Sequence, residues 1–241
     1  MVESAEETGS QTARAAELAA GLAAVETRIT AGCDAAGRSR DDVTLVVVTK
    51  TYPASDVRLL TGLGVREVGE SRDQEAAPKA AASADLDLHW HFIGRLQSNK
   101  ARSVARYAHA IHSVDRSSLV SALGRAAVEA DRTLSCFVQV SLDGDPSRGG
   151  VPVDEVPAMA DRVAGTEGLT VAGVMAVAPM NAEPDAAFAV LKAVSDRLRA
   201  THVAGTGISA GMSGDLEAAL RHGATHLRVG SAVLGLRPPL E

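Results

Sequence analysis

The chain has 241 residues, of which 46% are hydrophobic, and it carries a formal net charge of -6. Its length suits one large domain with a substantial core, whereas the acidic balance, the lack of a Lys/Arg cluster and an aromatic content of only 2% argue against a nucleic-acid partner. No apolar run reaches the roughly 20 residues that a membrane-spanning helix needs, so we expect no membrane partner either.

The chain begins with a polar, acidic stretch that lacks the apolar segment of a secretory signal. We therefore expect residues 1–10 to be a disordered tail. The two cysteines, Cys33 and Cys136, lack the spacing of metal ligands. They are expected to be plain thiols of a cytoplasmic protein.

Residues 11–36 predict an amphipathic helix, because apolar side chains recur there at helical spacing. These side chains are Leu18, Leu22, Val25 and Ile29. Short apolar runs follow at residues 44–49, 65–70, 89–94, 108–115, 134–142, 169–178, 205–212 and 226–235. Further helices are predicted between them, near residues 54–63, 72–83, 97–106, 116–131, 153–165, 183–200 and 214–222.

Eight alternating strand and helix units favour an α/β protein with a parallel sheet. In a chain of this length they predict a single TIM-type (β/α)₈ barrel with an extra N-terminal helix. A doubly wound open sheet is the competing layout. There is no linker rich in Pro, Gly or Ser and no shift in composition, so we expect one domain over residues 11–241.

In such a barrel, functional groups gather at the carboxyl ends of the strands. The segments that follow the predicted strands contain most of the informative polar residues: Lys50, then residues 69–71, 94–100, 173–179, 209–215 and 228–235.

The segment "SAGMSGDLEAAL" predicts a capped helix or, more specifically, a phosphate site. Gly211, Ser213 and Gly214 precede the helix, where backbone N–H groups and the helix dipole favour an anion. Gly230 and Ser231 offer further donors after the eighth run. The loops after strands seven and eight of TIM barrels often bind phosphate together, which favours the phosphate interpretation.

Lys50 ends the buried run "TLVVVTK", although lysine is seldom buried. Either its side chain extends to water or to an acidic neighbour, or desolvation favours the neutral amine, which is a nucleophile toward aldehydes. Together with a phosphate site, a nucleophilic lysine fits a Schiff-base enzyme for phosphosugars or a site for pyridoxal 5'-phosphate (PLP).

The sequence "HWHF" places His89 and His91 on one side of a strand. A metal pair is one interpretation, but no third ligand is evident, and a structural or cofactor-lining role is favoured. Tyr52 is expected to lead into a turn rather than to act as an acid or base.

Eight ordered segments resemble the motifs of the PLP homeostasis protein family, YggS-type PLP-binding proteins, from about residue 18 to residue 236. They are "VVVTKTYP", "GVREVGESRDQEA", "WHFIGRLQSNK", "HSVDR", "VQVSLDGDPSRGGV", "GLTVAGVMAVAP", "GISAGMSGDLEAAL" and "GATHLRVGSAVLG". The resemblance implies a fold type III PLP barrel like the N-terminal domain of alanine racemase, with PLP held covalently on Lys50 as an internal aldimine.

The resemblance also implies roles for further residues around the cofactor. Arg228 would face the pyridine nitrogen, and an arginine there disfavours the pyridinium form and weakens the ring as an electron sink. The phosphate would be held by Ser213, Gly230 and Ser231, beside Gly211 and Met212. The mouth of the barrel would be lined by Val48, His91, Asn99 and Met175. Ser71 stands where the family usually has asparagine, and Ser231 keeps the hydroxyl of the usual threonine.

Three functions remain open: a non-catalytic PLP carrier, a racemase-like PLP enzyme, and a Schiff-base aldolase. A racemase of this fold needs a second base, which the partner chain's C-terminal domain supplies in alanine racemases. We expect that domain to be absent here and expect a monomer. The favoured function is PLP homeostasis, by storage, buffering or delivery of the cofactor, with PLP-dependent apoenzymes as recipients.

Overall fold

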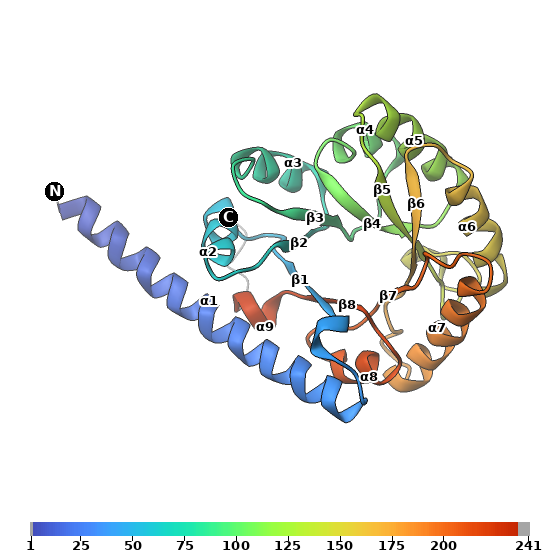
Figure 1. Cartoon of the computed structure of the whole chain (residues 1–241). Coiled ribbons are helices and arrows are strands. Elements are labelled where there is room, and N and C mark those ends of the chain that lie inside the picture. The colour runs from blue at the N-terminus through green and yellow to red at the C-terminus, as the bar shows by residue number, and fades with distance from the viewer. Residues whose placement is uncertain (1, 236–241) are drawn as a thin grey trace.

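The structure is a computed structural model that describes residues 2–235, with side chains from residue 11 onward. Met1 of the predicted tail and residues 236–241 of the predicted domain lie outside the described residues. Eight parallel strands form a closed barrel in chain order, and β1 pairs with β8 to close it (Figure 1). An open doubly wound sheet is thereby excluded, and the predicted barrel is confirmed.

The strands are short, and helices surround them on the outside of the barrel (Figure 1). The strands are β1 (Thr44–Val48), β2 (Glu67–Glu70), β3 (His89–Phe92), β4 (Ala108–Val114), β5 (Leu134–Gln139), β6 (Leu169–Met175), β7 (Gly207–Ser209) and β8 (His226–Val229). The α-helices are α1 (Val2–Ala35), α2 (Ala54–Gly62), α3 (Asp73–Ala82), α4 (Ala101–Val104), α5 (Ser117–Glu129), α6 (Val156–Ala164), α7 (Pro184–Arg199), α8 (Leu216–Arg221) and α9 (Ser231–Leu234). The 3₁₀-helices are η1 (Arg40–Asp42), η2 (Ser98–Lys100), η3 (Pro146–Arg148) and η4 (Val153–Glu155).

Burial on both faces explains the continuous apolar runs. In β1, Val46 and Val47 are fully buried, because one side faces the barrel interior and the other faces the helices. The main core lies between the strands and the surrounding helices. A small separate cluster of Ala110, Phe137 and Met175 lies inside the barrel.

Helix α1 packs along α8 and α9 through the predicted apolar stripe. Leu18, Val25 and Ile29 are at most 1% exposed. Gly21 is required at this contact, because a Cβ there would collide with the carbonyl of Val233. The helix begins at Val2, so residues 2–10 are helical where the sequence predicted a disordered tail. Their alanine and glutamate residues favour helix, and no proline interrupts them.

The last predicted strand is shorter than expected. The apolar run over residues 226–235 predicted a strand throughout, but β8 ends at Val229 and α9 follows. Gly230 has φ -114° and ψ -80°, which turns the chain out of the extended conformation. The short helix buries Val233 and Leu234 on the side that faces α1.

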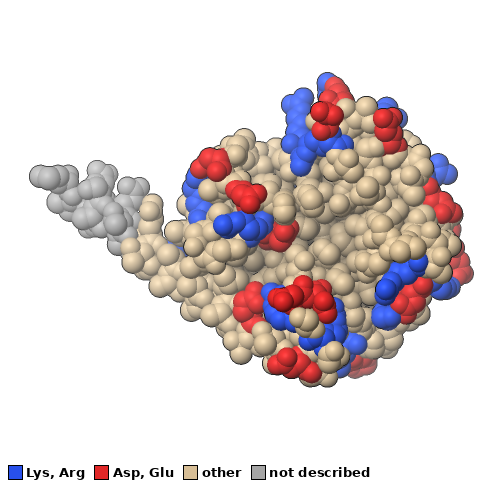
Figure 2. All heavy atoms as spheres, in the orientation of Figure 1, with Lys and Arg blue, Asp and Glu red and all other residues tan. Residues whose placement is uncertain are grey.

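Cationic and anionic side chains are intermingled on the face shown in Figure 2, and neither sign forms a continuous patch there. Among the described residues, no helix combines the length and the apolar character needed to cross a membrane. Cys33 and Cys136 are buried free thiols, as predicted.

Candidate functional site

Lys50 lies in a turn directly after β1, at the carboxyl end of the barrel, and is half-buried. The next residue, Thr51, has φ 72°, a left-handed conformation that is a rare and strained one for a β-branched residue. Its N–H donates to Glu75 Oε2 at 3.0 Å. The strained turn gives Lys50 a fixed place at the end of the strand.

A buried ion pair contacts the backbone at the end of β1. Lys79 Nζ lies 2.5 Å from Glu70 Oε1 and donates to the carbonyl of Thr49 at 2.8 Å. The Thr49 hydroxyl donates to the same Glu70 oxygen at 2.8 Å. Burial raises the pKa of Glu70, while Lys79 and Thr49 act in the opposite direction. Lys79 therefore has a structural role, because its ammonium group binds a buried carboxylate and a backbone carbonyl.

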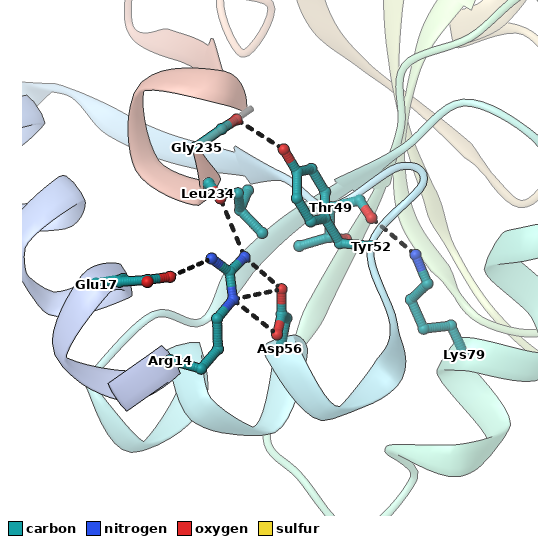
Figure 3. A network of polar contacts seen from close by, with 8 residues as sticks. All are labelled: Arg14, Glu17, Thr49, Tyr52, Asp56, Lys79, Leu234 and Gly235. Atoms are coloured by element: carbon teal, nitrogen blue, oxygen red, sulfur yellow. Dashed lines mark hydrogen bonds and ion pairs between the residues drawn. The ribbon is translucent and has the colours of Figure 1, made fainter. Parts of the chain in front are cut away.

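Tyr52 ties the same turn to the end of the described chain. Its hydroxyl donates to the carbonyl of Gly235 at 2.8 Å (Figure 3). Beside it, Arg14 bonds Asp56 at 2.7 Å and the carbonyl of Leu234 at 3.0 Å, so α1, α2 and α9 meet here. The predicted turn role of Tyr52 is confirmed, and its hydroxyl proton is used in a structural bond.

Arg228 lies inside the barrel on β8 and is only 5% exposed. Its guanidinium donates to Ser209 Oγ at 2.5 Å and to the carbonyl of Ala176 at 2.9 Å. Burial lowers its pKa to about 10, so it stays a cation at neutral pH. Among the described side chains, no carboxylate forms a salt bridge with it.

The two predicted phosphate loops lie side by side. Gly211 has φ 90°, and its carbonyl accepts the backbone N–H of Arg228 at 2.9 Å. Gly230 lies against β1, where a Cβ would approach the Val48 carbonyl to 3.2 Å. These close contacts bring the loop after β7, the end of β8 and the end of β1 together.

One interpretation of this segment was a capped helix, but Ser213 is not the residue that caps it. Helix α8 begins at Leu216 with Asp215 as the capping residue, and Asp215 Oδ1 accepts the Met212 N–H at 2.6 Å. Ser213 is half-buried, and Ser231, the first residue of α9, is exposed. Neither hydroxyl forms a hydrogen bond within the part of the chain that the structure describes.

Three neighbouring strands thus present complementary groups at one end of the barrel. Lys50 follows β1, Arg228 lies on β8, and Ser231 is the first residue of α9, two residues after β8. The loop after β7 presents the hydroxyl of Ser213. Such a set suits a ligand that carries an aldehyde, a hydrogen-bond acceptor and an anionic group.

The remaining predicted residues divide into two groups. Val48 and Met175 are the buried last residues of β1 and β6 and lie at the correct end of the barrel. Ser71, just after β2, lines a cavity of about 810 Å³. Asn99 is exposed on η2 and does not line this cavity, although Gln97 and Lys100 on either side of it do.

The placement of His91 at the mouth is wrong. His91 lies near the opposite, amino-terminal end of the barrel, in a pocket of about 270 Å³ that also includes Glu67, His109 and His226. Glu67 accepts from His91 at 2.6 Å and contacts His89 at 2.7 Å. No group of three or more possible ligands among the described residues is arranged to hold a metal ion, so the metal-pair interpretation gains no support.

Sequence reasoning missed several residues near the site, namely Glu70, Lys79, His112 and Ser209. Lys79 and Glu70 are nine residues apart on different elements, and His112 and Ser209 meet only through the barrel. The spacing of these residues in the sequence predicts neither contact.

Comparison with known proteins gives a consistent result. Residues 9–238 match the family model described as "Alanine racemase, N-terminal domain". A Mycobacterium bovis protein named "Pyridoxal phosphate homeostasis protein" is 47% identical over 244 residues, covering 93% of this chain and 94% of the relative. A protein of the same name from Pseudomonas aeruginosa is 38% identical, covering 91% of this chain and 96% of the relative.

A solved structure is similar over most of the chain. It is described as PipY, the COG0325 family member of Synechococcus elongatus, with PLP bound. It is 32% identical, with a TM-score of 0.79, and the alignment covers 90% of this chain and all of that one.

Proposed function

Because the chain belongs to the pyridoxal phosphate homeostasis protein family, we propose that it binds PLP and serves in intracellular PLP homeostasis, by storing, buffering or delivering the cofactor. The observation that carries this proposal is that Lys50, Arg228, Ser213 and Ser231 lie on or just after β1, β8 and β7, at the carboxyl end of the barrel. We propose further that Lys50 holds PLP covalently.

The residues present fit the cofactor group by group. The Lys50 amine suits the aldehyde, and formation of the Schiff base releases one water. Ser213, Ser231 and the backbone N–H groups of their loops suit the phosphate. Within the described part of the chain, Arg228 uses two of its five N–H donors, so donors remain for the pyridine nitrogen.

Arg228 determines what the bound ring can do. PLP supplies an electron-accepting ring, and that capacity is greatest when the ring nitrogen is protonated. A guanidinium that donates to the nitrogen and does not give up its proton keeps the nitrogen unprotonated. The site therefore favours holding the cofactor over stabilising a carbanion.

A non-catalytic role is also supported by the two tyrosines, which are the only ones in the chain. The Tyr52 hydroxyl donates to Gly235, and the Tyr107 hydroxyl lies 3.3 Å from Asp73 Oδ1. Burial, together with the Asp73 charge, raises the pKa of Tyr107. Neither tyrosine is suited to be a second base, which disfavours a racemase.

An absorbance spectrum of the purified protein, before and after borohydride reduction, tests the covalent site. We expect a band near the visible edge that is absent in Lys50→Ala, and peptide mapping should find the reduced adduct on Lys50. Lys79→Met is the matched control, because the amine of this other lysine reaches from α3 to the carbonyl of Thr49, and its loss should leave the adduct in place. An adduct on Lys79, or no band with PLP added, would refute the assignment.

The same loaded protein tests carrier against enzyme. We expect no interconversion of the alanine isomers, no aldol cleavage of phosphosugars, and transfer of PLP to a PLP-dependent apoenzyme. Chiral product would favour the racemase-like alternative, and phosphosugar turnover would favour the aldolase. We further propose that the carrier works as a monomer in the cytoplasm, and light scattering of the loaded protein checks the monomer.

A further inference from the structure

A continuous line of hydrogen bonds crosses the barrel interior from Arg228 to the amino-terminal pocket. Arg228 Nη1 lies 2.5 Å from Ser209 Oγ, and Ser209 Oγ lies 2.7 Å from His112 Nδ1. His112 Nε2 lies 2.8 Å from His91 Nδ1, and His91 Nε2 lies 2.6 Å from Glu67 Oε2. Four elements besides β8 contribute: β7, β4, β3 and β2.

The chemistry of the groups gives this line one direction. A guanidinium has no acceptor, so Arg228 donates to Ser209. At the other end a carboxylate can only accept, so His91 donates to Glu67 from Nε2–H and, as a neutral imidazole, accepts at Nδ1. The proton of neutral His112 then lies on Nε2 and is directed to His91 Nδ1, which leaves His112 Nδ1 to accept from the Ser209 hydroxyl. Each group donates to the next, from a cation at one end to an anion at the other.

Burial stabilises this arrangement. His112 and Ser209 are completely buried, and His112 stacks on Phe137 with ring centroids 4.5 Å apart. Burial lowers the pKa of His112 well below its usual range, and the charge of Arg228 acts in the same direction. His112 is therefore a neutral link between two charged ends.

Glu67 remains an anion at the far end. Burial raises its pKa, but hydrogen bonds from His91 and His89 outweigh burial and hold the pKa at about 2. Burial also lowers the pKa of the neighbouring His226 to about 4 and lowers that of His109. Glu67 thus ends the line beside histidines that favour their neutral forms.

We propose that Ser209, His112, His91 and Glu67 form a positioning relay for Arg228, through which the amino-terminal pocket sets how firmly the barrel mouth holds PLP. The proposal rests on the proposed function, because it assigns Arg228 to the PLP ring. A carboxylate that accepts from one imidazole nitrogen increases the basicity of the other nitrogen. Along this line, that effect strengthens each acceptor in turn and ends with the oxygen that fixes the Arg228 guanidinium.

A structural role alone makes a different prediction. If these side chains only fill the barrel, changes at Glu67 will alter stability and leave the mouth unaffected. Glu67 is half-buried in the distant pocket, so its conservative variant separates the two cases. His89 provides a matched control, because it is exposed and contacts the other oxygen of the same carboxylate without belonging to the relay.

The experiment measures PLP release and the absorption maximum of the bound cofactor in wild type, Glu67→Gln, Ser209→Ala and His89→Ala. We expect release to be about tenfold faster in Ser209→Ala, as for loss of one hydrogen bond to a charged group. In Glu67→Gln we expect release about fivefold faster, typical of coupling between distant sites, with a shifted maximum. His89→Ala should behave as wild type. Normal release and an unshifted maximum in Glu67→Gln would overturn the relay.

A second measurement uses the protein without PLP and separates the relay from the proposed function. Nitrogen NMR of the histidines should show the proton of both His112 and His91 on Nε2, and Glu67→Gln should shift the His112 signals. A proton on His112 Nδ1 would reverse the direction and refute the relay. If wild type binds no PLP, the proposed function fails, and Arg228 loses its assigned role in the relay with it.

Discussion

At the scale of single residues, Glu70 and Lys79 form a buried ion pair that stabilises the end of β1 beside Lys50. The pair is not part of the proposed PLP site. The ammonium of Lys79 satisfies both Glu70 and the carbonyl of Thr49, one residue before Lys50. Burial raises the pKa of Glu70 and so opposes its charged form. The pair therefore depends on both partners, and removing one partner costs more than removing both.

We predict that Lys79→Met will destabilise the protein by about 3 kcal/mol, because it leaves a buried carboxylate and a carbonyl without their donor. The double variant Lys79→Met, Glu70→Gln should recover more than half of that loss, since no buried charge remains. Urea denaturation of both variants beside wild type measures this. If the single and double variants are equally stable, the unpaired Glu70 carboxylate is not the cause of the loss, and the prediction is wrong.

At the scale of secondary-structure elements, the strand and helix pattern predicted the barrel, because each apolar run reports burial on both faces. It also predicted which residues follow strands, so Lys50, Ser71 and Ser213 were placed at the correct end. The alternation of residues along a strand shows which side chains face the barrel interior. It does not show how far along the barrel axis each side chain lies. The resemblance assigned His91 to the mouth, and the strand pattern could not correct this, although His91 lies beside Glu67.

Asn99 is exposed on η2, so its place at the mouth of the barrel stays a prediction. The end of β8 was missed because Val233 and Leu234 are as apolar as a strand, but they face α1 from a short helix. Contacts between distant elements, such as Tyr52 with Gly235, have no signature in sequence spacing.

That contact gives a prediction for α9. Tyr52→Phe removes the hydrogen bond to Gly235, which we expect to cost about 1 kcal/mol of stability. It should also weaken PLP binding several-fold, because α9 begins at Ser231 in the proposed phosphate site. Titration with PLP measures the dissociation constant. Tyr107→Phe is the matched control, since its hydroxyl contacts Asp73 elsewhere, and an equal loss of affinity there would contradict this explanation.

At the scale of the whole molecule, the barrel interior is more polar than the branched apolar filling usual for this fold. His91, His112 and His226 lie within it, near Arg228 and Glu67. Burial lowers the pKa of His226 to about 4 and lowers that of His112 well below its usual range. Both side chains are therefore neutral in the folded protein at pH values where the unfolded chain protonates them.

The sign of the resulting pH dependence follows from this difference. Above the unfolded histidine pKa of about 6.5, both states are neutral at these positions, so stability is complete. As the pH falls from about 6.5 toward 4, the unfolded state binds protons that the folded state excludes, and stability is lost. For His226 alone the loss approaches about 3 kcal/mol, since one pKa unit corresponds to about 1.4 kcal/mol.

We therefore predict that the free energy of unfolding will fall steeply between pH 6.5 and 4 and that His226→Gln will flatten part of this slope. Glutamine keeps a polar side chain beside Thr225, which now lies 2.8 Å from His226 Nδ1, but it has no proton to gain. Urea denaturation at a series of pH values gives both curves. Parallel curves for wild type and His226→Gln would contradict the prediction, because they would show that His226 binds protons equally in both states. A flatter curve would show that the folded barrel keeps His226 neutral at pH values where the unfolded chain protonates it.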